Sequence, residues 1–277
     1  MTKWSPTERE WGLAMALIQA EERQRIAKFR YRVDMVSSLV GRLMLRSLAV
    51  SVLALRNTEA QFERTERGKP VLTHNTRGWD YNVSHAGDWV VLAAAQEARL
   101  GVDVMRTRDS RVERLEEFFR LMRRQFTEQE WVTINGGKED SDETRLERFF
   151  RHWTLKESYV KAVGTGLNID LRTLNFKLSE PSVECQVISS TKLEVDEEIT
   201  SWLFEESILD KEHAVSVAVD GSSPVRIDAV KFEVLNIDQI FELMSLNQAD
   251  NLDEQLLRPV DPCDFATFCS KDHPKPF

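Results

Sequence analysis

The sequence lacks the features that would place it in a membrane, in a secretory pathway or on a nucleic acid. No uninterrupted apolar run approaches 18 residues, and the opening residues MTKWSPTEREW contain no apolar stretch typical of a signal peptide. Positive charge is also in deficit, because 37 lysines and arginines face 46 aspartates and glutamates, a net charge of −9. We therefore expect neither nucleic acid nor membrane as a partner, and any anionic ligand needs a local basic cluster.

Cysteine is scarce. Cys185, Cys263 and Cys269 are odd in number and show no zinc-ligand spacing with histidine. A reduced compartment is the simplest interpretation, and we expect a cytoplasmic, cytosolic protein. Without a cluster of histidines or thiolates, a bound metal ion would have to be held by carboxylates.

The length and pattern of the chain predict an α+β fold with two similar halves. A chain of 277 residues, 42% hydrophobic and 30% charged, is large enough for two compact units. Each half shows helices followed by antiparallel strands, and the segment EHAVSVAVD echoes GDWVVLAAA. We expect a pseudo-twofold duplication, each half an antiparallel sheet with a long helix. The predicted parts are residues 1–108, residues 109–221 and an appendage of unknown role at residues 222–277.

Periodicity and turn residues predict the elements of the first half. One helix is expected through WGLAMALIQAEERQRIAKF, and a second from Asp34 to about Arg56. Residues Asn82–Ala95 read as two strands joined by a tight turn, and Gly101–Met105 reads as a third strand that completes a meander.

Later elements are predicted in the same way. Thr127 and Glu130 form a capping box at the start of a helix. The appendage carries a strand, Lys231–Leu235, and a helix, Asp238–Leu246. The strands expected in the second half are Leu174–Leu178, Val183–Ile188, Lys192–Val195, Thr200–Glu206 and Ala214–Val219.

The stretch Phe149–Leu167, FFRHWTLKESYVKAVGTGL, combines an apolar helix face with charge. As a helix it places Lys156, Glu157 and Lys161 on or beside the face that carries its aromatic residues. Charge on a core-facing surface is costly unless it is paired or binds something charged. The alternative is an ordinary surface pair of Glu157 and Lys161, four residues apart.

Asp103 is unusual in the apolar strand GVDVM, because aspartate is depleted in strands. It is either a strand-end aspartate that faces water or a ligand. Asp103 and Glu157, two carboxylates from separate elements, would suit Mg²⁺, which takes one or two carboxylates together with phosphate oxygens.

Two shorter motifs allow two interpretations each. Gly68-Lys69-Pro70 is a plain turn or a loop that approaches a nucleotide. Ser84-His85 is a surface pair or part of a binding site, and adjacent residues of a strand face opposite sides, so the pair is no catalytic dyad.

The motifs together, in the order GKPVL, NVSHAGDWVVLAAA, GVDVM and FFRHWTLKESYVKAVGTGL, resemble the 4′-phosphopantetheinyl transferases of the surfactin type, and most closely the animal enzymes of that group. The resemblance covers roughly residues 8–220, and W-x-x-K-E-x-x-x-K is its most specific part. It implies that Asp103 and Glu157 bind Mg²⁺ and that Lys161 contacts the pyrophosphate of coenzyme A. These three residues are also the implied catalytic group. The residues implied to bind coenzyme A elsewhere are Arg25, Gly68, Lys69, Pro70, Val71, Leu72, Thr73, Asn82, Val83, Ser84 and His85.

One position departs from the bacterial pattern. The bacterial strand reads D-x-E, and its second acid would fall at Met105, which cannot bind Mg²⁺. The resemblance therefore implies that a water replaces this ligand, as in the animal type, and that Asp103 and Glu157 carry the metal site.

The implied function is transfer of the phosphopantetheine arm from coenzyme A to a serine of acyl or peptidyl carrier proteins, with release of 3′,5′-ADP. Fatty acid synthase and aminoadipate-semialdehyde dehydrogenase-like proteins are the implied carriers, and a monomer is expected. The alternatives are a non-catalytic scaffold that binds coenzyme A and a Mg²⁺-dependent nucleotide phosphohydrolase.

Overall fold

The computed structural model describes residues 4–73, 78–107, 114–164, 166, 169–179, 187–222, 232–245 and 263–272. Contacts divide the chain into two units, of which unit 1 contains residues 1–74, 88–90 and 233–276 and unit 2 contains residues 75–87 and 91–232. Cys185 and most of the strand predicted at Val183–Ile188 lie outside the described residues. Within the described part, no helix is long and apolar enough to cross a bilayer.

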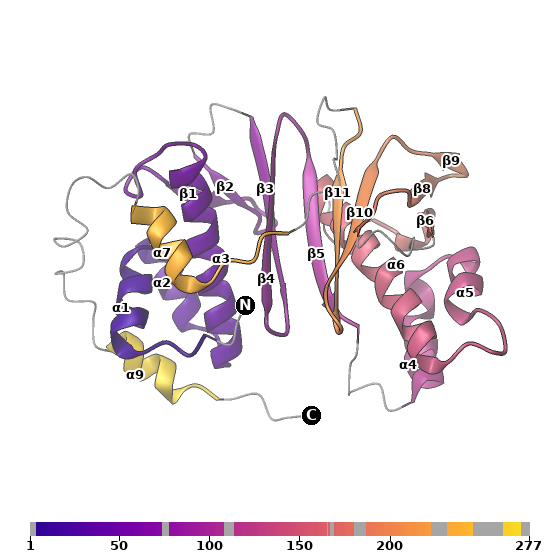
Figure 1. Ribbon diagram of the computed structural model, residues 1–277, viewed down its shortest axis with the longest axis horizontal. Helices are drawn as coiled ribbons and strands as arrows, with labels where there is room; N and C mark the ends of the chain where they lie inside the picture. The colour runs from indigo at the N-terminus through magenta and orange to yellow at the C-terminus, as the bar shows by residue number, and fades with distance from the viewer. Residues whose placement is uncertain are drawn as a thin grey trace. The chain divides into compact units, whose positions relative to one another are not determined.

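Unit 1 is built on three helices and a short antiparallel hairpin (Figure 1). The helices are α1 (Glu8–Ala16), α2 (Ala20–Ala27) and α3 (Arg32–Ser51), and the hairpin joins β1 (Phe62–Arg64) to β2 (Pro70–Leu72).

The single helix predicted for the start of the chain is wrong, because Gln19 is extended and separates α1 from α2. The Gln19 side chain accepts the Phe62 N–H at 2.8 Å and donates to the Phe62 carbonyl at 3.2 Å. This tertiary contact overrides the local helix pattern.

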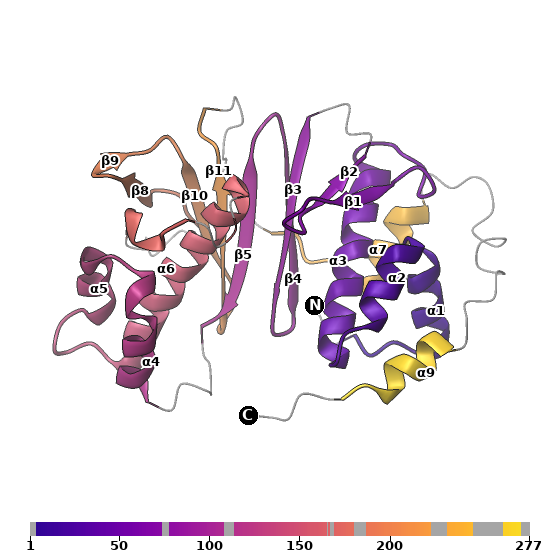
Figure 2. The same cartoon turned by 180° about the vertical axis from the view of Figure 1, so that it is seen from behind.

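The C-terminal segment completes the core of unit 1. Helix α7 (Ile237–Ser245) packs on α3, and α9 (Cys263–Ser270) packs on α1, α2 and α3, as both ribbon views show (Figures 1 and 2). The helix predicted at Asp238–Leu246 is therefore confirmed as α7. The predicted strand Lys231–Leu235 is wrong for its described residues, since 232–236 form no strand.

The main sheet of unit 2 has the order β5-β11-β10-β7. Strand β5 (Leu100–Arg106) pairs antiparallel with β11 (His213–Val219), which pairs with β10 (Leu203–Asp210), and β10 pairs with β7 (Val187–Ile188). Strands β3 (Trp79–Ala86) and β4 (Trp89–Gln96) form a separate hairpin. The three strands of the predicted meander exist, but the meander is wrong because the backbone partner of β5 is β11.

On its other side, β5 is held by side chains of β3. Asp80 accepts the N–H of Leu100 at 3.0 Å, and Asn82 accepts that of Val102 at 3.1 Å. The next step of this ladder is a longer contact from the Val104 N–H to the Ser84 hydroxyl, at 3.4 Å. Alternate polar side chains thus replace the carbonyls of a neighbouring strand, satisfying donors that would otherwise be buried without a partner.

Helix α6 (Asp142–Val163) is the long helix of unit 2 and packs on β5 and β11 (Figure 2). Ser141 caps its start and Gly164, in the left-handed conformation, ends it as predicted. The remaining elements of this unit are α4 (Leu115–Met122), η1 (Arg123–Gln125), α5 (Glu128–Asn135), η3 (Leu171–Thr173), β6 (Leu174–Lys177), β8 (Lys192–Val195) and β9 (Glu198–Ile199).

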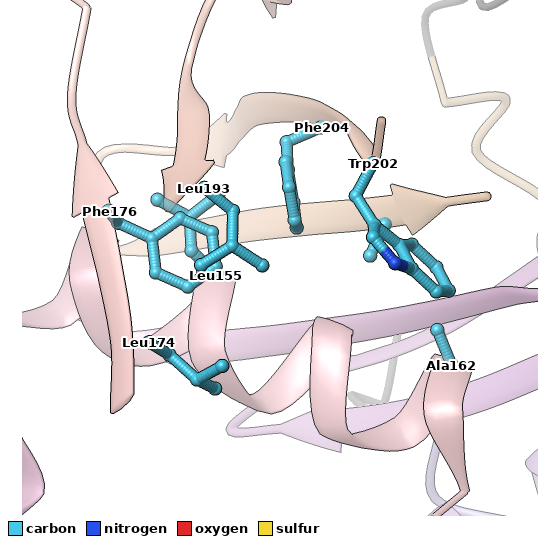
Figure 3. Packing of buried hydrophobic residues seen from close by; sticks show 8 residues of the cluster. Leu155, Ala162, Leu174, Phe176, Leu193, Trp202 and Phe204 are labelled. Carbon is cyan, nitrogen blue, oxygen red and sulfur yellow. The ribbon is translucent and has the colours of Figure 1, made fainter. Parts of the chain in front are cut away.

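A core cluster of unit 2 joins α6 to strands of the main sheet and to β6 and β8. Leu155 and Ala162 face a cluster that includes Phe176, Leu193 and Phe204 from the strands (Figure 3). The capping box of Thr127 and Glu130 at the start of α5 is confirmed. The α+β class is confirmed as well, whereas the duplication and the boundaries at residues 108 and 221 stay predictions.

Candidate functional site

Asp103 lies in the middle of β5 and is buried, with a relative exposure of 5%. Alternation along the strand puts it on the same face as Gly101, which lies directly against the backbone of Ser158 and Ala162 in α6. Asp103 therefore faces the long helix, and the interpretation as a strand-end aspartate in water is wrong.

Two side chains share one oxygen of this carboxylate. The Lys161 ammonium donates to Asp103 Oδ1 at 2.7 Å, and the Ser84 hydroxyl donates to the same atom at 2.8 Å. Lys161 also donates to Ser84 Oγ at 2.8 Å and to the Val102 carbonyl at 3.3 Å. The buried negative charge of Asp103 is thus paired and hydrogen-bonded, which is the condition for burying it.

Glu157 lies on α6, one turn before Lys161, and is half-buried. Burial raises the pKa of the Glu157 carboxyl, the nearby charge of Asp103 raises it further, and Lys161 opposes both effects. Among the described residues no ion pair joins Glu157 to Lys161, whose partner is Asp103. The ordinary surface pair is therefore not formed, and two carboxylates and one ammonium share a small region.

These residues suit a hard divalent cation. Asp103 Oδ2 is buried and has no hydrogen-bond partner among the described residues. An acceptor in this state is costly unless something binds it. No group of three or more histidines, cysteines, aspartates and glutamates in the described part of the chain is placed to hold a metal. Two carboxylates without thiolate or imidazole suit Mg²⁺ rather than zinc.

Met105 and Lys156 take part in packing and in core hydrogen bonds rather than in the cluster of Asp103, Glu157 and Lys161. Met105 packs against the aromatic cluster around Phe119 and Phe149. The Lys156 ammonium is fully buried and donates to Glu130 at 2.8 Å and to the carbonyls of Leu171 and Leu174, both at 2.6 Å. Its three donors are used inside the core, so the Lys156 ammonium has none left for a phosphate group.

A second charged cluster occurs in unit 1, around the buried carboxylate of Glu22. Arg25 and Arg64 bond to Glu22, at 3.1 and 2.9 Å, and Arg42 lies 3.7 Å from it. Together these groups lower the pKa of the Glu22 carboxyl despite its burial. Three arginines around one carboxylate leave a net charge of +2, which favours an anion.

Arg64 links this cluster to the GKP motif. Its guanidinium donates to the Gly68 carbonyl at 2.8 Å, in the turn between β1 and β2 where Gly68 has a φ of 82°. The predicted residues Arg25 and Gly68 are therefore brought together. Glu22 and Arg64 were missed by the sequence reasoning, although Arg64 lies only four residues before Gly68.

The other predicted residues lie on two hairpins. Lys69, Pro70, Val71, Leu72 and Thr73 follow Gly68 on or beside β2 in unit 1. Asn82, Val83, Ser84 and His85 lie on β3 in unit 2, with Asn82 and Ser84 buried and His85 exposed. Because Ser84 is buried and His85 is exposed, the two side chains point to opposite faces of β3, as predicted for adjacent strand residues.

Two family models match the chain. The family model described as 4′-phosphopantetheinyl transferase, N-terminal, matches residues 2–97, and the model of the 4′-phosphopantetheinyl transferase superfamily matches residues 99–218. The chain is similar to the L-aminoadipate-semialdehyde dehydrogenase-phosphopantetheinyl transferase of Homo sapiens, with 41% identity over 79% of this chain and 73% of that protein.

Two further relatives show the range of the similarity. The protein of the same name from Xenopus laevis is 40% identical over 78% of this chain and 72% of its own length. The 4′-phosphopantetheinyl transferase Sfp of Bacillus subtilis is more distant, with 26% identity over 60% of this chain and 69% of that protein. Both the resemblance to the animal enzymes and the transferase activity are thereby confirmed: the chain belongs to the 4′-phosphopantetheinyl transferase superfamily.

Proposed function

We propose that this protein transfers the 4′-phosphopantetheine arm of coenzyme A, in a Mg²⁺-dependent reaction, to a serine of acyl or peptidyl carrier proteins and releases 3′,5′-ADP. The observation that carries the proposal is the cluster of Asp103, Glu157 and Lys161, in which one buried carboxylate oxygen has no hydrogen-bond partner among the described residues. The names of the relatives indicate phosphopantetheine as the transferred group.

Each residue of the cluster has a role that follows from its charge. Asp103 and Glu157 would hold Mg²⁺, which when bound offsets the charge of the pyrophosphate and orients it for in-line attack. Lys161 lies beside both carboxylates and would stabilise negative charge that develops on the phosphate oxygens. The arginine cluster in unit 1, with Arg25 and Arg64, offers net positive charge for a further phosphate group of coenzyme A.

The serine of the carrier protein must lose its proton during transfer. We assign the acceptor role to Glu157, or to a water that it positions, because its carboxylate lies in the same small region as Asp103 and Lys161. The Asp103 carboxylate already accepts hydrogen bonds from Lys161 and Ser84 on one oxygen, which leaves it less available for the serine proton.

The proposed acceptors are carrier domains, including those of fatty acid synthase and of aminoadipate-semialdehyde dehydrogenase-like proteins, the latter suggested by the names of the animal relatives. We propose that the protein acts as a cytosolic monomer. Incubation with coenzyme A alone separates the alternatives. A phosphohydrolase would release 3′,5′-ADP without a carrier, whereas a scaffold would bind coenzyme A and release nothing under any condition.

The decisive measurement is the intact mass of an apo acyl carrier protein incubated with this protein, coenzyme A and Mg²⁺. We expect a gain of one phosphopantetheine arm, abolished by EDTA and reduced at least about 100-fold in rate by Glu157→Gln. Glu143→Gln, an exposed glutamate in the first turn of the same helix, is the matched control and should retain the full rate. No gain with several carriers, despite binding of coenzyme A, would favour the scaffold.

A further inference from the structure

The Ser84 hydroxyl occupies a central place in the carboxylate cluster, although its motif points only to coenzyme A. We propose that Ser84 is a positioning residue for the metal site: it fixes the Asp103 carboxylate so that Oδ1 is used within the protein and Oδ2 is kept for Mg²⁺. The inference rests on the proposed function, because it concerns the same metal site, and it assigns to Ser84 a task that does not require contact with coenzyme A.

The hydrogen bonds of Ser84 define its orientation. Its oxygen accepts from the Lys161 ammonium at 2.8 Å, with a longer contact from the Val104 N–H at 3.4 Å, so its single proton is directed to Asp103 Oδ1 at 2.8 Å. Ser84 is buried and has little freedom to choose another partner. The hydroxyl therefore donates to the carboxylate and fixes the rotation of its plane.

The consequence appears at the other oxygen of Asp103. Oδ1 receives two hydrogen bonds, from Lys161 and Ser84, whereas the buried Oδ2 receives none from the described residues. Without Ser84, the Lys161 ammonium could be shared by both oxygens, and Oδ2 would no longer be reserved. Loss of a partner that orients a metal ligand in this way typically lowers metal affinity roughly 10- to 100-fold.

The test is a Mn²⁺ titration followed by electron paramagnetic resonance, with full-length protein saturated with coenzyme A and with Mg²⁺ as competitor. For Ser84→Ala we expect the Kd for Mn²⁺ to rise about 10-fold or more. The affinity for coenzyme A measured in EDTA should stay unchanged. If instead coenzyme A binding in EDTA weakens and Mn²⁺ affinity is retained, Ser84 acts by direct contact with coenzyme A and the positioning role is wrong.

Ser216→Ala is the matched control. Ser216 is also buried and lies opposite Asp103 in the register of β11, but its hydroxyl donates to Thr154 at 3.0 Å. Its removal should leave Mn²⁺ affinity unchanged, and an equal loss in both variants would reveal a general packing effect and overturn the inference. Ser84→Cys, similar in size and a weaker donor, provides the same comparison if Ser84→Ala does not fold.

The Mn²⁺ titration distinguishes an incorrect metal site from an incorrect role of Ser84. If the wild-type protein with coenzyme A binds no Mn²⁺, the proposed metal site is wrong and the role of Ser84 with it. If the wild-type protein binds Mn²⁺ and Ser84→Ala binds it equally well, the metal site stands and only the inference about Ser84 is overturned.

Discussion

At the scale of single residues, Gly101 sets the distance between the strand that carries Asp103 and the helix that carries Glu157 and Lys161. A Cβ at this position would lie 2.1 Å from the Ser158 carbonyl oxygen and 2.5 Å from the Ala162 nitrogen. Both are backbone atoms of α6, so no side-chain rotation can relieve the overlap. Only glycine lets the helix approach β5 this closely.

Gly101→Ala is therefore expected to move α6 away from β5 and to separate the carboxylates. A misplacement of about 1 Å costs roughly 100-fold in catalysis, and overpacking costs about 1–3 kcal/mol in stability. Steady-state kinetics and urea unfolding measure the two effects. The control is Gly137→Ala, where a Cβ would meet nothing closer than 4.0 Å. A Gly101→Ala variant with wild-type kcat/KM would show that this close approach does not position the site.

His152 makes the stability of unit 2 depend on pH. Burial, assisted by the nearby charges of Lys156 and Arg151, lowers the pKa of His152 from 6.5 to about 4. The unfolded chain takes up a proton below pH 6.5 while the folded chain does not, so stability falls as the pH drops from 6.5 towards 4. Between pH 7.5 and pH 5, the free energy of unfolding should fall by about 2 kcal/mol less in His152→Phe than in the wild-type protein. Urea unfolding at the two pH values measures this difference. Parallel pH profiles would contradict this account.

Asp103, Glu157 and Lys161 stand out in the sequence as candidate site residues because each breaks a local rule. Asp103 is an acid in an apolar strand, and the other two are charges beside an aromatic helix face. Lys156 breaks the same rule, yet its charge is paired inside the core with Glu130. The sequence cannot separate these cases, because the partner that distinguishes them comes from another element.

At the scale of elements, the pair of Lys156 and Glu130 joins α6 to α5 and β6. Both side chains are fully buried, and Glu130 also accepts the Phe176 N–H at 3.0 Å. Such a pair adds little net stability compared with an apolar replacement, but breaking it leaves one charge buried without its counterion. We therefore regard it as a determinant of how α6 is seated, and so of where Glu157 lies.

Lys156→Met should lower the free energy of unfolding by about 3–5 kcal/mol. Adding Glu130→Gln, which removes the stranded charge but keeps an acceptor for Phe176, should recover at least half of this loss. Urea unfolding of the single and double variants measures the coupling. The folded Lys156→Met protein should keep its KM for coenzyme A, whereas a large rise in that KM would show that Lys156 contributes to coenzyme A binding.

Elements formed by local rules could be predicted, and their partners could not. The capping box of Thr127 and the end of α6 at Gly164 depend on neighbours in sequence, and both are confirmed. The pairing of β5 with β11, and its attachment to β3 through side chains, depend on contacts distant in sequence. Hydrophobic alternation gives the faces of a strand but not its neighbour, which is why the meander is wrong.

At the scale of the whole molecule, the C-terminal segment is part of the core of unit 1 rather than an appendage to it. Ile240, Met244 and Phe268 are buried in helices that pack on α1, α2 and α3. The aromatic ring of Phe268 stacks on Trp11 with centroids 4.4 Å apart. The sequence alone left the role of this segment open, because a short helix such as α9 shows its apolar face only once Trp11 is placed beside it.

Because α9 packs on α1, α2 and α3, we expect the C-terminal segment to stabilise these N-terminal helices. Phe268→Ala removes a buried ring and its stacking on Trp11, and we expect a loss of about 3–5 kcal/mol in the free energy of unfolding. Val234→Ala, at an exposed position of the same segment, should change it by less than about 0.5 kcal/mol. Urea unfolding followed by tryptophan fluorescence measures both. Equal, small effects would mean that α9 rests on unit 1 without stabilising it, and that the role of the segment lies elsewhere than in the core.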